Sequence, residues 1–94
     1  MTVKVNLNPD TWTLISSAAV GYMDNQSGSV VKYRLEDFAP DDAEIWGHQL
    51  KLEKGIGWSL STPKNIYGRT SGSIGDVIVT EADNVWGSHD LFVN

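Results

Sequence analysis

Apolar and polar residues alternate with a period of two in several short windows of the chain. The clearest window is 31–36, in which Val31, Tyr33 and Leu35 alternate with charged residues. Such alternation is typical of a strand that buries one face and exposes the other. We predict further strands of this kind in windows 3–7, 11–16, 56–61, 65–69 and 76–81.

Turn-forming residues separate these windows at 8–10, 24–29, 62–64 and 71–73. Short strands at this spacing each have one apolar face, which only a second sheet or closure of the sheet can cover. We therefore predict an all-β fold, a single small antiparallel β-sandwich or barrel-like domain with little or no helix. The core should lie in about 3–81, with 82–94 as a final edge strand or an arm.

The segment 41–54 is the ambiguous part of the pattern. Asp41 followed by Glu44 resembles a helix capping box, and Gly55 could end a helix. Against a helix, Gly47 lies in the interior, and the apolar or aromatic positions 46, 48, 50 and 52 share one face at period two. We predict a turn followed by a strand.

Composition narrows the possible functions. The 94 residues suit one domain, and the absence of cysteine excludes disulfides and thiolate metal sites. The net charge is −5 with dispersed basic residues, so we expect no nucleic-acid partner. No segment is long and apolar enough to span a membrane, and the N-terminal residues lack the apolar stretch of a signal peptide. We expect a chain made in the cytoplasm and not secreted by a signal peptide.

Candidate catalytic groups are few and poorly spaced. Ser88, His89 and Asp90 are triad residue types, but immediate neighbours in an extended chain point to alternate faces and cannot align. We interpret His48 as a half-buried strand histidine. The sequence therefore predicts no catalytic residues, no enzymatic activity and no cofactor.

Acidic residues are densest in 36–44, where hard oxygen ligands could in principle hold Ca²⁺. Their spacing matches no calcium loop. The segment beginning at Asp24 resembles the start of an EF-hand loop, but Leu35 stands where the twelfth-position Glu should be. We interpret both segments as solvated turns and predict no metal site.

Four tryptophans are many for a chain of this size, and such residues serve both cores and interfaces. Trp12 and Trp58 are in phase with aliphatic neighbours and are predicted to lie in the core. Trp46 and Trp86, each followed by glycine, are predicted to be partly exposed. The candidate interaction surface combines the acidic turn with the C-terminal apolar residues: Asp41, Asp42, Glu44, Trp46, Trp86, Leu91 and Phe92.

The order of these segments resembles a known group of proteins. It is carried by Thr11-Trp12-Thr13-Leu14-Ile15, the turn at 25–28, the strand at 31–35, Ala39-Pro40, Leu50-Lys51-Leu52, Ile66-Tyr67-Gly68-Arg69 and Val77-Ile78-Val79-Thr80. In this order, 10–81 resembles small β-sandwich structural proteins of tailed bacteriophages, the head decoration (cement) or fibre accessory proteins. The acidic 41–44 insertion and the residues after Glu81 depart from that pattern.

The resemblance implies a non-enzymatic virion protein that binds the coat-protein lattice by multivalent surface association, as a homo-oligomer and often a trimer. Two alternatives remain open. One is a small acidic phage-encoded inhibitor of a host protein, for which the cluster at 36–44 could imitate nucleic acid. The other is a carbohydrate-binding module that uses Trp46, Trp86 or Tyr67 as stacking platforms.

Overall fold

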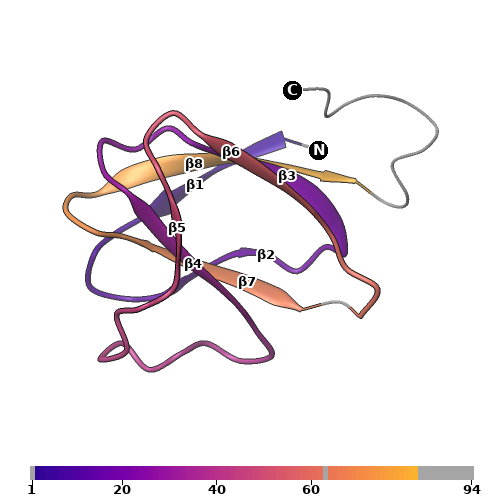
Figure 1. The fold of residues 1–94 in the computed structure, drawn as a ribbon, viewed down its shortest axis with the longest axis horizontal. Helices are drawn as coiled ribbons and strands as arrows, with labels where there is room; N and C mark the ends of the chain where they lie inside the picture. Colours follow the sequence, from indigo (N-terminus) through magenta and orange to yellow (C-terminus); the bar gives the residue numbers. More distant parts are fainter. Residues whose placement is uncertain (1, 63, 83–94) are drawn as a thin grey trace.

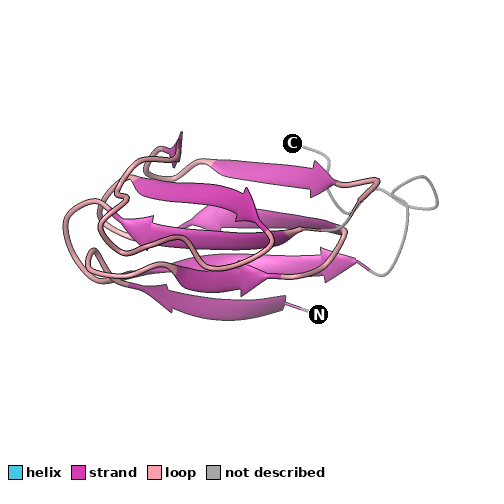
Figure 2. Ribbon diagram, turned by 90° about the horizontal axis from the view of Figure 1, so that it is seen from below, coloured by secondary structure: helices cyan, strands magenta, loops and turns pink. Residues whose placement is uncertain are grey.

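The computed structural model describes residues 2–62 and 64–82, and within them the chain forms strands and loops but no helix (Figure 2). This content of strands and loops confirms the all-β prediction. The strands are β1 (Thr2–Leu7), β2 (Thr13–Ser16), β3 (Val20–Asn25), β4 (Val31–Glu36), β5 (His48–Leu50), β6 (Gly55–Ser59), β7 (Asn65–Thr70) and β8 (Gly75–Ala82).

The strands form two antiparallel sheets that pack face to face as a β-sandwich (Figure 1). The first sheet has the order β1-β8-β3-β6, and the second has the order β2-β7-β4-β5. In the second sheet β4 pairs with β7 along its whole length, whereas it pairs with β5 only from Val31 to Tyr33. The part of β4 beyond Tyr33 therefore lies beside the loop that enters β5.

The core lies between the sheets and is built from the inward positions of alternating strands. In β4 the inward residues are Val31, Tyr33 and Leu35, as the sequence pattern predicts. Trp58 of β6 also packs against this core, which confirms its predicted place. The buried members of the cluster are Leu7, Ile15, Met23, Val31, Leu50, Ile66, Val77 and Val79.

The central strand β3 was not among the predicted strands, and its residues explain why. Its inward positions are Gly21, Met23 and Asn25, a set that breaks the expected apolar face. Trp58 covers Gly21 so closely that a Cβ there would collide with the indole ring. Glycine on β3 thus makes room for the large aromatic residue of β6.

The turn after β3 is closed by a buried amide. Asn25 is fully buried, and its Nδ2 donates to the backbone oxygens of Ser29 at 3.0 Å and Leu50 at 2.9 Å. Its Oδ1 accepts hydrogen bonds from the backbone N and the hydroxyl of Ser27. The turn predicted at 24–29 is therefore stabilised from within, and it ties β3 to the end of β5 in the other sheet.

Candidate functional site

The connection between β4 and β5, residues 37–47, folds over the outer surface of the second sheet. It is the loop at the bottom of Figure 1, on the side of β4 and β7 that faces away from the first sheet. The Asp41 carboxylate accepts the backbone N–H of Ala43 at 2.9 Å, and the Asp41 backbone oxygen accepts that of Glu44 at 2.9 Å. The sequence that resembles a capping box thus forms a tight turn, and the predicted turn and strand are confirmed.

Trp12 attaches this loop to the outer surface of the second sheet. Only 6% of the residue is exposed, yet Trp12 is not part of the cluster between the sheets, to which Ile15 belongs. Its Nε1 donates to the backbone oxygen of Glu44 at 2.8 Å. The predicted burial of Trp12 is confirmed, but it lies beneath this loop and not in the cluster between the sheets. Apolar residues occupy both faces of β2, and Trp12 is buried because the loop covers it.

Arg34 of β4 contacts the rings of both Trp12 and Trp46. Its guanidinium carbon is 3.7 Å from the ring centroid of Trp46 and 5.7 Å from that of Trp12. The guanidinium pairs with Glu44 at 2.8 Å and with Glu36 at 2.7 Å, and only 10% of the side chain is exposed. The hydrogen bond to Glu44 is the largest contribution that raises the pKa of Arg34. The indole of Trp46 thus stacks on a charge that Glu44 of the loop and Glu36 of β4 neutralise.

Arg69 of β7 fixes the other side of the loop. Its two terminal nitrogens donate to the backbone oxygens of Asp42 at 2.9 Å and Pro9 at 2.6 Å, and its guanidinium carbon lies 5.3 Å from the Trp12 ring centroid. The Asp42 carboxylate accepts the Thr11 hydroxyl at 2.7 Å. These hydrogen bonds join the loop to β7 and to the segment before β2, and they therefore fix the conformation of the loop.

The predicted acidic residues of the interaction surface therefore stabilise the loop. Asp41, Asp42 and Glu44 are all exposed, but each carboxylate also accepts an internal hydrogen bond. The large apolar side chains of the same loop are left in solvent: Phe38 is 84% exposed, Ile45 58% and Trp46 61%. We call these three side chains the loop face. The predicted partial exposure of Trp46 is confirmed.

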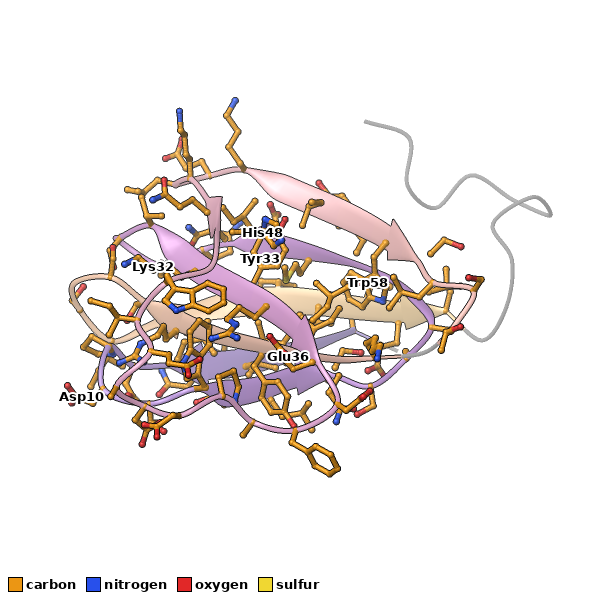
Figure 3. All side chains as sticks on the ribbon, turned by 60° about the horizontal axis from the view of Figure 1, so that its bottom comes forward. Asp10, Lys32, Tyr33, Glu36, His48 and Trp58 are labelled. Carbon is orange, nitrogen blue, oxygen red and sulfur yellow. The ribbon has the colours of Figure 1, made fainter. Side chains whose placement is uncertain are left out.

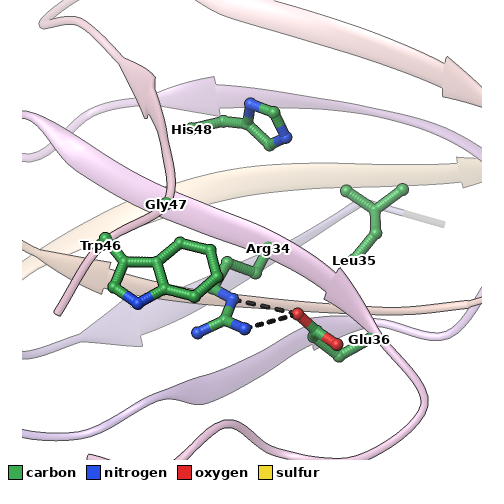
Figure 4. A pocket seen from close by; sticks show the side chains of 6 residues that line it. All are labelled: Arg34, Leu35, Glu36, Trp46, Gly47 and His48. Carbon is green, nitrogen blue, oxygen red and sulfur yellow. Dashed lines mark hydrogen bonds and ion pairs between the residues drawn. The ribbon is translucent and has the colours of Figure 1, made fainter. Parts of the chain in front are cut away.

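A shallow pocket of about 390 Å³ lies beside Trp46, where β4 and β5 diverge. Figure 4 shows the indole over Arg34, with Glu36 on one side and His48 on the other. Leu35 and Gly47 complete the wall. The pocket thus combines apolar carbon with one guanidinium, one carboxylate and one imidazole.

His48 lies at the start of β5 and is exposed, so its prediction as half-buried is wrong. It pairs in register with Tyr33 near the sheet edge, and the two rings lie side by side, 5.3 Å apart (Figure 3). Burial raises the pKa of the Tyr33 hydroxyl. β5 has three residues and is an edge strand, so the second sheet leaves one side of His48 in solvent.

Trp86, Leu91 and Phe92 of the predicted interaction surface lie outside the described residues, as do Ser88, His89 and Asp90. In the described chain, no three His, Asp or Glu side chains come together as a metal site. The same residues include no helix long and apolar enough to cross a membrane.

Sequence reasoning missed Phe38, Ile45 and the two arginines that hold the loop. The exposure of Phe38 could have been predicted, since it is an apolar residue between the end of a strand pattern and Ala39-Pro40. The arginine contacts leave no signal in the sequence, because they depend on the path of the loop.

Comparison with protein-family models, with curated proteins and with solved structures finds no match.

Proposed function

We propose that the protein is a non-enzymatic binding module that associates with another protein through its loop face. The observation that carries this proposal is a loop fixed by Trp12, Arg34 and Arg69 that nevertheless exposes Phe38 and Trp46. Exposed apolar side chains on a rigid support lose little conformational entropy on binding, and they are typical interface anchors.

Charge defines the partner further. Asp41 and Asp42 border the loop face and form no ion pair within the described chain. A partner groove that is apolar at its centre and basic at its rim would match both features. The net charge of −5 would attract such a partner over longer range.

We further propose that this partner is the coat-protein lattice of a tailed bacteriophage, to which the chain would add as a decoration protein of the virion. The resemblance of segments 10–81 to such proteins supports this assignment, and so does the rigid β-sandwich. Many weak copies of one contact on a repeating lattice would suffice for stable attachment.

Copy number in purified particles of the encoding phage tests this assignment. Quantitative mass spectrometry should find the chain at a number that matches symmetry-related positions of the capsid lattice. A few copies per particle would instead indicate a tail or fibre position and would reject decoration. Complete absence from particles would reject the virion assignment and favour binding to a host protein.

Carbohydrate binding is a second candidate, favoured by the pocket beside Trp46. The indole that stacks on Arg34 offers a surface for a sugar ring, and Glu36 and His48 lie where they could bond hydroxyl groups. Titration of tryptophan fluorescence with a panel of soluble glycans tests it. A saturable change that Trp46→Phe abolishes would support this candidate, and a flat response across the panel would reject it.

A further inference from the structure

The edge strand β6 differs from the other three edges of the sandwich. Edge strands expose unpaired backbone groups, and proteins protect them by shortness, by irregular pairing or by charged side chains. β5 has only three residues, the pairing of β2 shifts between Leu14 and Ser16, and β1 carries the exposed Lys4. Each of these edges therefore has a protective feature.

β6 has none of these features. It runs from Gly55 to Ser59 without a charge or a proline, and all five residues pair in continuous register with β3. In the order of the first sheet β3 is its only neighbour, so its other edge faces no described strand. Ile56 and Trp58 pack against the core but remain partly exposed at this edge.

We propose that the free edge of β6 pairs with β6 of a second copy of this chain, in an antiparallel two-fold arrangement centred on Gly57. This inference does not rest on the proposed function. In this register Ile56 faces Trp58 of the other copy on the inner side of the sheet. Such pairs of a β-branched and an aromatic residue stabilise neighbouring strands.

The flanking residues agree with the same register. Gly55 faces Ser59 of the other copy, so small residues meet on the outer side. If the ladder extends by one position, Lys54 faces Leu60, and the like charges of the two Lys54 side chains do not meet. The two first sheets would join into one continuous sheet across an isologous interface.

Gly57→Lys tests the register without disturbing the chain itself. A Cβ at Gly57 would lie 3.5 Å from its nearest neighbours, which is ordinary contact, so the monomer should fold. In the proposed dimer the two lysines would stand opposite each other and repel. Gly28→Lys is the matched control, because a Cβ there meets nothing within 4 Å and Gly28 lies in the turn after β3.

Sedimentation velocity on the full chain, over roughly 1 µM to 1 mM, measures the association. We expect the wild type and Gly28→Lys to pass from monomer to dimer, and Gly57→Lys to raise the dissociation constant at least about tenfold. Mixing Gly57→Lys with Gly57→Glu chains should restore a dimer, because opposite charges then meet. Circular dichroism confirms that each variant is folded.

Three results would overturn the inference. They are a wild type that stays monomeric over this range, a Gly57→Lys chain that associates as tightly as Gly28→Lys, or a mixture of the two charged variants that remains monomeric.

Discussion

Replacing Trp12 by Phe removes a hydrogen bond and part of the aromatic surface from beneath the loop face. The indole of Trp12 is buried and donates to the backbone oxygen of Glu44 at 2.8 Å. A hydrogen bond of this kind contributes about 0.5–1.5 kcal/mol. The smaller ring also loses two buried carbons, at about 0.8 kcal/mol each. We expect Trp12→Phe to lower the free energy of unfolding by about 2–3 kcal/mol.

Trp58 provides a matched control, because its indole donates to the backbone oxygen of Ala18 at 2.9 Å and packs against the core between the sheets. Trp58→Phe should lower the free energy of unfolding by a similar amount. Only Trp12→Phe should selectively loosen the loop, because of the two tryptophans only Trp12 bonds to residue 44. Hydrogen exchange of amides 41–47, corrected for the change in global stability, distinguishes the two variants.

Urea unfolding gives the free energies, and thermal unfolding should show a fall in Tm of about 4–8 °C for each kcal/mol lost. A Trp12→Phe variant that loses less than about 0.5 kcal/mol would refute the reasoning, since that is the lower bound for the hydrogen bond alone. Equal loosening of amides 41–47 in the two variants would also refute it, because the loop would then depend on the whole sandwich.

Three further substitutions test other parts of the fold. Asn25→Ala should cost at least about 1–3 kcal/mol in urea unfolding, because the buried oxygen of Leu50 loses its amide donor; no measurable loss would contradict the role of this turn. Glu53 has a φ of 62°, so Glu53→Gly should raise stability by up to about 1 kcal/mol, and a lower Tm would contradict relief of strain. Burial raises the pKa of Tyr33 above 10.0 and favours its neutral form, so stability should fall as pH rises through that pKa. Tyr33→Phe should remove this part of the loss, which begins near pH 10.0, the ordinary pKa of tyrosine, and an unchanged pH dependence would contradict it.

The strands that could be predicted are those in which one face is consistently apolar. Val31, Tyr33 and Leu35 show this in β4, since every inward position there is large and apolar. β3 could not be found this way, because Gly21 and Asn25 occupy inward positions for reasons that lie elsewhere in the chain. Gly21 accommodates Trp58, and Asn25 bonds to Leu50 of the other sheet.

The candidate site was predictable only where a residue is conspicuous by itself. Trp46 next to a glycine indicates an exposed aromatic residue, and it is exposed. Trp12 lies in a segment that is apolar on both faces, so periodicity alone cannot assign its side. Its burial depends on Arg34, Arg69 and the returning loop, and these contacts join distant parts of the chain.

The central claim is that the loop face binds the partner, and occupancy of phage particles by variant chains tests it most directly. Phe38→Ser with Trp46→Ala removes two exposed side chains of the loop face, and Ile74→Ser is the matched control, since Ile74 is 68% exposed in the turn before β8. The account predicts that the double variant remains folded and falls at least about tenfold in copies bound per particle, while Ile74→Ser binds as the wild type does. Equal occupancy by all three chains would contradict it.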